Sequence, residues 1–389
     1  MVTTQNPVQK PPSPAGDPVL VSGAGFAGLA MAYWLNRLGF QVTVVEAAPK
    51  LRKGGTPVDI EGDTIGILQR MGMFDAVRAK MLPPRAFEFK DAQDQTLGGF
   101  GVEPGPDAPP QGRFEIHRDD LLDILFSGVK RSVEMVFNRS IRQLDDRSDG
   151  VTVTLNDGSH RTYALVFGCD GNRSNTRKLV FGDEKKFAYF MGGYVYLKVV
   201  PVLGMLPPDV SQVFSVPGRT VMLNGYDDRT DIGLAFRTEG EIDYDYRDRA
   251  QQRALIHSHF DGLGWKTPTA LKHVDTGDDF YFDKINQIRM PSWSKGRVAL
   301  VGDAGYCVSP LAGMGGSMAI IGAGRLAEAL ERHGVDYAAA FQDYHDNLRA
   351  FVDEVQEKAV RDGMATIFPA DETEIAERNR RLRVGELEL

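Results

Sequence analysis

The sequence predicts an α/β protein (α+β overall) with a domain of alternating strands and helices, an inserted antiparallel β-sheet domain and a C-terminal helical tail. An apolar strand, a glycine-rich turn and a helix follow one another near residue 18 and again near residue 298. Between these units, residues 181–283 carry β-like runs and almost no glycine-rich turn. We therefore expect a mobile tail over 1–17, a discontinuous first domain over 18–84, 103–180 and 284–334, a sheet domain over 85–102 and 181–283, and helices over 335–389.

The composition argues against several classes of function. Of 389 residues, 42% are hydrophobic and 25% charged, the proportions of a soluble globular protein. The net charge of −8 argues against nucleic-acid binding and against a polybasic membrane anchor. Cys169 and Cys307 form no CxxC pair and the seven histidines lack metal-ligand spacing, so we expect no metal. Because there is neither a run of about 18 apolar residues nor a targeting segment, we expect a cytoplasmic monomer that binds no membrane.

The N-terminal unit has the pattern of a dinucleotide-binding motif. A strand over 18–22 runs into a GxGxxG sequence, a helix follows to about Leu38, and the next strand ends at Glu46. In such a Rossmann-like unit Gly23 makes the turn, Gly25 lets a pyrophosphate approach, and Gly28 packs the helix on the strand. An acidic residue at position 46 favours an unphosphorylated ribose, as in the adenosine half of FAD or NAD. The residues expected at the cofactor here are Gly23, Gly25, Phe26, Ala27, Gly28, Glu46 and Ala47.

Two basic segments follow this unit. The turn Arg52-Lys53-Gly54-Gly55 is either a plain solvated loop or a cover over the cofactor. Arg118 lies at the start of a helix predicted from the segment 115–125, where it can reach a phosphate or a ribityl chain; a surface ion pair is the alternative. Between them, residues 60–77 have helical spacing and 87–102 is typical of a hairpin.

A second strand in the first domain ends in Asp-Gly. Strands are predicted around 140–144, 151–155 and 161–166, and the apolar run 164–167 leads to Asp170-Gly171. A helix is expected to start close to Ser174. Asp170-Gly171 is either an ordinary tight turn or a further ligand contact at a strand end.

The inserted domain is expected to bind the substrate. Strands are predicted over Tyr194–Val200, Gln212–Val216, Thr220–Asn224 and Asp231–Arg237, with a short helix and loop in 261–276. Alternation puts Gly233, Ala235 and Arg237 on one face of the last strand and Phe236 on the other, and the sequence does not say which face lines a cavity. The candidate substrate-binding residues are Met222, Asn224, Phe236 and Arg237.

The C-terminal unit of the first domain is a third strand that ends in Gly302-Asp303. A carboxylate there can hold the hydroxyls of a sugar or ribitol chain, because ligands bind at the carboxyl ends of such strands. The glycine-rich turn lets the backbone approach a flat ligand, and the following helix directs its positive N-terminus at it, as suits a reduced flavin. Residues expected at the flavin are Gly302, Asp303, Pro310, Gly313, Met314, Gly315, Gly316 and Ser317, with Pro310 and the amides of 313–316 facing the isoalloxazine. The helical tail, broken at 368–369, is either a structural brace or a cover for the substrate cavity.

Together these motifs resemble the three FAD motifs of single-component (group A) flavoprotein monooxygenases with the para-hydroxybenzoate hydroxylase fold. The turn at 52–55, the run 280–283, the segment 293–297 and the helical tail look most similar to the tetracycline-inactivating branch and its polyketide-tailoring relatives. The resemblance implies FAD bound through Gly25, Glu46, Arg118 and Asp303, with NADPH or NADH as a transient co-substrate. It also implies hydroxylation of a large polycyclic phenolic or enolic molecule through a flavin C4a-hydroperoxide, without a separate catalytic side chain.

Two departures from the family pattern stand out. Many members have Ala-His where this chain has Gly305-Tyr306, and Gly-Gln-Gly followed by Asn where this chain has Gly313-Met314-Gly315-Gly316-Ser317. The backbone amides are then left to contact the flavin. Alternative functions are a flavoprotein reductase on the same scaffold and a non-catalytic, ligand-sequestering flavoprotein. A halogenase is disfavoured because Trp293 lacks the expected Trp-x-Trp-x-Ile-Pro context.

Overall fold

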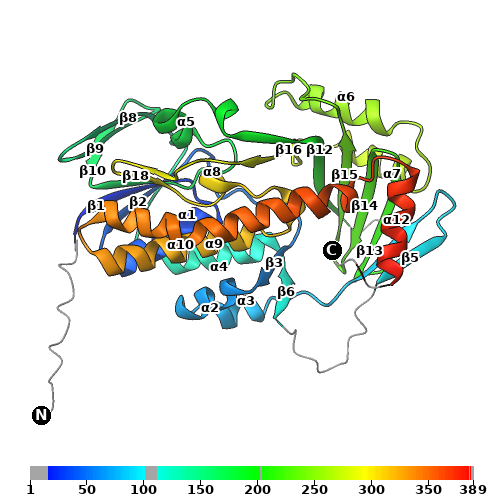
Figure 1. Cartoon of the computed structure of the whole chain (residues 1–389), viewed down its shortest axis with the longest axis horizontal. Coiled ribbons are helices and arrows are strands. Elements are labelled where there is room, and N and C mark those ends of the chain that lie inside the picture. The colour runs from blue at the N-terminus through cyan, green and yellow to red at the C-terminus, as the bar shows by residue number, and fades with distance from the viewer. Residues whose placement is uncertain (1–15, 101–111, 202–203, 385, 387–389) are drawn as a thin grey trace, which may run out of the picture.

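The computed structural model describes residues 16–100, 112–201, 204–384 and 386. The expected tail over 1–17 and the expected loop over 103–112 therefore lie almost wholly outside the described residues. The α/β fold class is confirmed. Two large sheets stand side by side, and α10 runs from the first domain towards the second sheet (Figure 1). Among the described helices, none is long and apolar enough to span a membrane.

The first domain is built on a six-stranded sheet with the order β17-β18-β11-β1-β2-β7. Its strands are β1 (Pro18–Ser22), β2 (Gln41–Glu46), β7 (Glu134–Phe137), β11 (Leu165–Gly168) and β18 (Val298–Leu300), all parallel, and β17 (Ser294–Lys295), which is antiparallel to β18. Alternate side chains of β1 belong to different hydrophobic cores. Val19 and Val21 pack towards the helices, whereas Leu20 packs towards a smaller sheet. Burial on both faces explains why these strands are short, continuous apolar runs.

Helices cover one face of this sheet and a small antiparallel sheet covers the other (Figure 1). The main helices are α1 (Phe26–Arg37), α4 (Arg118–Val129), α9 (Gly315–His333) and α10 (Tyr337–Lys358). The small sheet comprises β8 (Ile141–Arg147), β9 (Gly150–Leu155) and β10 (His160–Tyr163). Shorter elements are β3 (Val58–Glu61), α2 (Asp63–Arg70), α3 (Phe74–Arg78), β6 (Arg113–Ile116), α5 (Asn175–Phe181), η1 (Glu184–Lys186), α8 (Asp303–Tyr306) and η2 (Pro310–Ala312).

The inserted domain is a seven-stranded sheet with the order β16-β12-β15-β14-β13-β4-β5. Its strands are β4 (Ala86–Lys90), β5 (Thr96–Phe100), β12 (Ala188–Pro201), β13 (Val210–Val216), β14 (Arg219–Gly225), β15 (Arg229–Arg237) and β16 (Tyr281–Ile288). All neighbours are antiparallel except β4 and β13, which are parallel. Helices α6 (Arg249–Phe260) and α7 (Thr267–Val274) bury one face. The other face meets η3 (Ala359–Gly363), α11 (Met364–Ile367) and α12 (Glu372–Arg383) of the tail.

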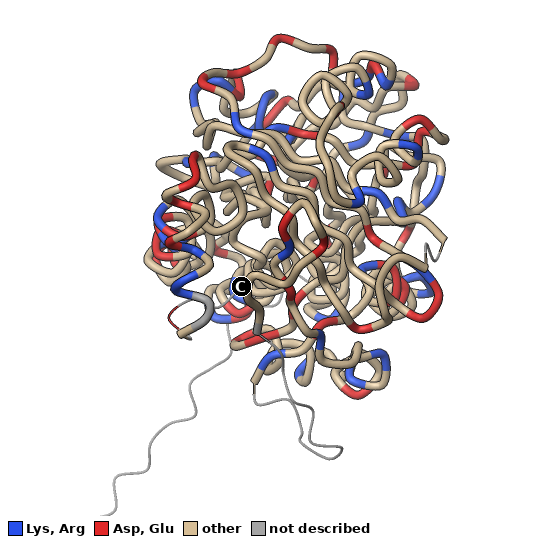
Figure 2. The backbone as a smooth tube through the Cα atoms, turned by 90° about the vertical axis from the view of Figure 1, so that its right-hand side faces the viewer, with Lys and Arg blue, Asp and Glu red and all other residues tan. Residues whose placement is uncertain are grey.

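Three details correct the sequence-based expectations. The segment 60–77 begins with strand β3 and continues as two short helices rather than one. The sheet domain contains α6, which lies before the expected short helix. Strand β16 pairs with β12, so the boundary expected at residue 284 falls inside a strand of the large sheet. In the view of Figure 2, acidic and basic residues are interspersed along the backbone.

Candidate functional site

Three parallel strands end together at one edge of the six-stranded sheet. Ser22 of β1 pairs with Gly168 of β11, and Gly168 pairs with Leu300 of β18. Each strand continues into a turn and a helix: α1, α5 and α8 respectively. The carboxyl ends of neighbouring parallel strands are where open α/β sheets bind ligands. The structure therefore brings the three predicted motifs to one place.

The glycines of the first motif have three separate roles. Gly23 has φ +103°, and a Cβ there would meet the Cys169 carbonyl oxygen at 2.4 Å. A Cβ on Gly28 would meet the Gly23 carbonyl oxygen at 1.8 Å, so the helix can pack on the turn only without a side chain. Gly25 has open space beside it and begins α1, where no side chain of the described residues caps the helix. Free amides beside open space fit the pyrophosphate of a dinucleotide.

Glu46 is held in place at the end of β2. Its Oε2 accepts a hydrogen bond from the Ala24 amide at 2.9 Å, and its Oε1 accepts from the Ala48 amide at 2.8 Å. These two hydrogen bonds fix the carboxylate next to the first glycine turn. Ala47, also expected at the cofactor, lies between Glu46 and Ala48 in the chain. The remaining lone pairs can accept from the hydroxyls of a ribose.

Arg118 joins the basic turn to the start of α4. Its Nη1 donates to the carbonyl oxygens of Arg52 at 2.9 Å and Gly54 at 3.0 Å, and its guanidinium lies 5.3 Å from the centre of the Phe26 ring. Lys53 pairs with Asp123 at 2.7 Å. The turn 52–55 is exposed, but these contacts tie it to α4. Arg118 bonds to backbone carbonyls, and burial lowers the pKa of its guanidinium.

Asp170 accepts hydrogen bonds from the N-terminal end of α5, a structural role that the sequence does not predict. Its Oδ1 accepts from the Ser174 hydroxyl at 2.5 Å, and its Oδ2 accepts from the Thr176 amide at 2.9 Å and hydroxyl at 2.8 Å. The preceding turn needs Gly171, which has φ +80°. The next residue after Thr176, the buried Arg177, donates to the Ala304 carbonyl at 2.9 Å and so joins α5 to α8. Asp170 therefore shapes this edge of the site, and its contact with the cofactor stays a prediction.

Asp303 begins α8 directly after β18. Its side chain is half-buried, and desolvation raises the pKa of its carboxyl to about 6, although a hydrogen bond with the Cys307 thiol opposes the shift. The preceding Gly302 has φ +67°, and a Cβ there would meet Ala27 at 3.1 Å. The Asp303 carboxylate is thus presented close to the start of α1, where it fits the hydroxyls of a ribityl chain.

The unusual Tyr306 is explained by the packing of helices α9 and α10. Its side chain is fully buried, and Tyr344 donates to its hydroxyl at 2.8 Å. Space for the ring exists because position 322 is glycine; a Cβ there would lie 1.8 Å from the Tyr306 hydroxyl. Where many members of the family have a histidine, this chain therefore has a tyrosine that packs in the core. In the sequence, only Gly322 indicates the space for its ring.

The segment 309–317 forms a second uncapped helix start. Ser309 has φ +86°, a strained conformation that holds η2, and Gly313 follows with φ +67°. Helix α9 begins after Met314 without a side-chain cap from the described residues, and a Cβ on Gly315 would meet open space. The positive end of this 19-residue helix is therefore free for a flat anionic ligand.

Two other residues of this segment have structural roles. Ser317 was expected at the flavin, but its hydroxyl donates to the Asp59 carbonyl at 2.8 Å and holds β3. Gly316 packs against Val58, 3.3 Å from the position of a Cβ. The amides, rather than these side chains, remain available to a ligand.

The predicted substrate residues divide between the two faces of the large sheet. Phe236 is fully buried and stacks on His259, with ring centres 3.7 Å apart, so its assignment to a substrate pocket is wrong. Asn224 accepts from the Ser211 hydroxyl at 2.7 Å, and Arg237 donates to the Phe368 carbonyl at 3.1 Å. Met222 alone of the four has a half-exposed apolar side chain.

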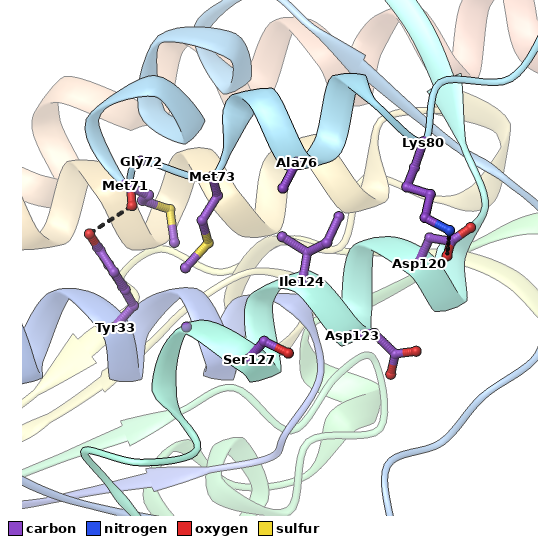
Figure 3. A pocket seen from close by; sticks show the side chains of 11 residues that line it. Tyr33, Met71, Gly72, Met73, Ala76, Lys80, Asp120, Asp123, Ile124 and Ser127 are labelled. Carbon is purple, nitrogen blue, oxygen red and sulfur yellow. Dashed lines mark hydrogen bonds and ion pairs between the residues drawn. The ribbon is translucent and has the colours of Figure 1, made fainter.

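A groove of about 570 Å³ lies between helices α1, α3 and α4 (Figure 3). The Tyr33 hydroxyl donates to the Met71 carbonyl at 2.8 Å along one wall, and Lys80 pairs with Asp120 at 3.4 Å at the other end. Its lining residues are distinct from those predicted to contact the cofactor.

Comparison with known proteins places the chain in a family. The FAD binding domain family matches residues 17–359. An uncharacterized protein of Mycobacterium tuberculosis is 40% identical over 344 residues, covering 87% of this chain and 91% of that protein. A flavin-dependent monooxygenase of Legionella longbeachae is 35% identical over 351 residues, covering 88% of this chain and 87% of that protein.

Solved structures give the same result. The tetracycline destructase Tet(51) is 31% identical with a TM-score of 0.83, over 95% of this chain and 96% of its own. The destructase Tet(55) is 32% identical with a TM-score of 0.83, over 96% of each chain. The free helix starts at Gly25 and Gly315, the anchored Glu46 and the half-buried Asp303 fit FAD. The chain belongs to the FAD binding domain family and is an FAD-dependent monooxygenase that resembles the tetracycline destructases.

Proposed function

We propose that this monooxygenase hydroxylates a large polycyclic phenolic or enolic substrate of the tetracycline or aromatic polyketide type, with NADPH or NADH and dioxygen as co-substrates. The overall reaction inserts one oxygen atom into a C–H bond, reduces the other to water and oxidises the nicotinamide. Similarity to two tetracycline destructases over nearly the whole chain supports this substrate class.

The observation that carries the proposal is an apolar face of the seven-stranded sheet beside the segment expected to contact the flavin. Val195, Leu197 and Met222 are half-buried on this face, whereas the opposite face is buried under α6 and α7. On the same face Ala235 packs in one cluster with Leu311 of η2. A mostly apolar wall next to a cofactor is typical of a site for a flat, hydrophobic ligand.

The chain's own residues bind FAD and the substrate, orient them and exclude water. FAD, when bound, supplies the redox chemistry, and the residues proposed to hold it are Gly25, Glu46, Arg118 and Asp303. The fully buried Phe368 joins the tail to the apolar face, in contact with the cluster formed by Met191, Ala235, Ile285 and Ala359. Because water competes with the substrate for activated oxygen, a covered apolar cavity favours hydroxylation.

Product mass tests the proposal. The FAD-loaded protein is incubated in air with NADPH or NADH and a panel of tetracyclines and aromatic polyketides. A substrate-dependent gain of one oxygen supports the proposal. Reduction of the substrate without oxygen gain would indicate a reductase, and binding without consumption of NADPH or NADH would indicate a sequestering protein; either result would overturn it.

A further inference from the structure

One buried carboxylate lies on the substrate-facing side of the large sheet. Asp231 follows the turn between β14 and β15 and pairs with Val199 of β12. Side chains alternate along a strand, so Asp231 shares its face with Gly233. Gly233 in turn pairs with Leu197 and Met222, two members of the apolar wall. Asp231 is therefore at one end of the proposed substrate-binding face.

The hydrogen-bonding capacity of this carboxylate is largely unfilled. Asp231 is 2% exposed, and within the described ranges 16–100, 112–201 and 204–384 neither of its carboxylate oxygens has a hydrogen-bond partner of good geometry. Burial raises the pKa of the carboxyl, and the Tyr226 hydroxyl is close enough to lower it in part by weak hydrogen bonding. Leaving a buried polar group unsatisfied costs about 1–3 kcal/mol, and more when it is charged. Because buried polar groups are nearly always bonded, such a residue calls for a missing partner.

The neighbouring arginine Arg85 is already paired, whereas the Tyr226 hydroxyl only accepts from it and keeps its own hydrogen. Arg85 is 8% exposed; its Nη1 donates to the Tyr226 hydroxyl at 2.5 Å and its Nη2 to Glu115 Oε2 at 2.6 Å. This chain of contacts joins the large sheet to β6 of the first domain. The positive charge of Arg85 is thus balanced by Glu115.

A second arginine close to Asp231 is balanced as well. Arg229 pairs with the exposed Asp228 at 2.7 Å. Arg85, Arg229 and Glu115, together with the Tyr226 hydroxyl, are the groups that act on the ionisation of Asp231. With Asp228 included, the two arginines face three carboxylates, which leaves one negative charge in excess at Asp231.

We propose that Asp231 is the polar end of the proposed substrate-binding face and binds a positively charged amine on the polycyclic substrate. This inference rests on the proposed function and narrows its substrate class to molecules that carry a basic amine. An ammonium group donates hydrogen bonds to the free carboxylate oxygens and cancels the excess charge. A hydroxyl group on the substrate would donate a hydrogen bond to the Asp231 carboxylate but would not neutralise its buried charge.

The raised pKa of the Asp231 carboxyl agrees with a missing counter-ion. Burial raises the pKa of the Asp231 carboxyl to about 7, against opposing effects of Tyr226, Arg85 and Arg229. A bound ammonium would favour the ionised form and lower this pKa again.

The test compares two ligands that differ in one amine. Tetracycline and 4-dedimethylaminotetracycline are titrated into the oxidised, FAD-loaded protein without NADPH or NADH, and ligand fluorescence reports binding. We expect the native protein to bind tetracycline roughly 10- to 100-fold more tightly, the range for a hydrogen bond between charged groups. Asp231→Asn should bind both ligands with the affinity that the native protein has for the deaminated one.

Asp227→Asn is the matched control, because it removes the same charge from an exposed residue four positions away that pairs with neither arginine in the described residues. It should keep the native preference. A native protein without the preference, or a preference retained in Asp231→Asn, would overturn the amine site. If the native protein neither binds nor oxygenates any of the panel, the proposed function and this inference fall together; if it oxygenates both ligands equally well, only the amine site falls.

Thermal unfolding without ligand separates binding from a structural role. Removing an unpaired buried charge should leave the unfolding temperature of Asp231→Asn unchanged or higher. A clearly lower temperature would show that the carboxylate stabilises the fold through Arg85, and would contradict the inference.

Discussion

Asp303 lies half-buried at the end of β18, where the pKa of its carboxyl is raised to about 6. Ribityl hydroxyls that donate to this carboxylate would supply hydrogen bonds of the charged kind, each worth about 1.5–3 kcal/mol. We predict that Asp303→Ala weakens FAD binding by roughly 10- to 100-fold. Titration of the apoprotein with FAD measures this. A variant that purifies with full flavin occupancy would contradict the role.

The same carboxyl should make flavin binding depend on pH. Its folded-state pKa of about 6 exceeds the ordinary value of 3.8, so this group costs the apoprotein stability as pH rises from about 4 to about 6. Hydroxyl donors favour the ionised form, so FAD affinity should fall as pH drops below about 6. FAD titrations at several pH values check this. Asp303→Asn should lack this pH dependence. If the variant has the same pH profile of FAD affinity as the native protein, another group causes the dependence.

At the scale of single residues, the sequence predicts contacts that depend on neighbours along the chain. Glu46 lies where the motif requires, because the strand–helix–strand unit is local. Ser317 and Phe236 have partners that the sequence does not predict, because these come from β3 and from α6. Such partners become visible only when the chain is folded.

Helix α1 offers a matched pair of glycines. A Cβ at position 25 meets open space, whereas a Cβ at position 28 meets the Gly23 carbonyl oxygen at 1.8 Å. Gly25→Ala should leave the unfolding temperature of the apoprotein close to native but impair FAD binding, because the methyl group occupies the path of the pyrophosphate. Gly28→Ala should lower the free energy of unfolding by about 1–3 kcal/mol or more. Thermal unfolding and FAD titration separate the two effects; equal losses of stability would be evidence against this division of roles.

Among the elements, buried strands are predicted best. Their apolar runs and bounding glycines are local signals, and β1, β2, β11 and β18 follow them. Helix α6 escapes prediction because its sequence is largely polar, with Ile256 and Phe260 among its few fully buried positions. Strand β16 is assigned to the wrong domain because only its pairing with β12 reveals its sheet.

Across the whole molecule, the C-terminal tail covers the substrate-facing sheet and braces it. Phe368 is fully buried there, and Arg378 donates to Ser215 of β13 at 2.9 Å. Of the two roles that the sequence leaves open, the structure shows the brace; closure of the substrate cavity by the tail stays a prediction.

We predict that Phe368→Ala lowers the free energy of unfolding by about 3–5 kcal/mol, the usual cost of truncating a buried phenylalanine. A less well covered cavity should also raise the ratio of NADPH or NADH consumed to product formed. Denaturant unfolding and coupled product assays measure the two effects. Val384→Ala, at an exposed position of the same tail, is the control and should change neither. Native stability and coupling in Phe368→Ala would refute the role of the tail.

The central claim is that an FAD site at three strand ends serves oxygen insertion into a substrate held against the large sheet. The most direct measurement is the mass of the product formed under heavy-isotope dioxygen, with a tetracycline that the protein binds. We predict that the product carries one heavy oxygen atom and that one NADPH or NADH is consumed for each product molecule. A modified substrate without the heavy isotope, or nicotinamide oxidation with no change in the substrate, would contradict the account.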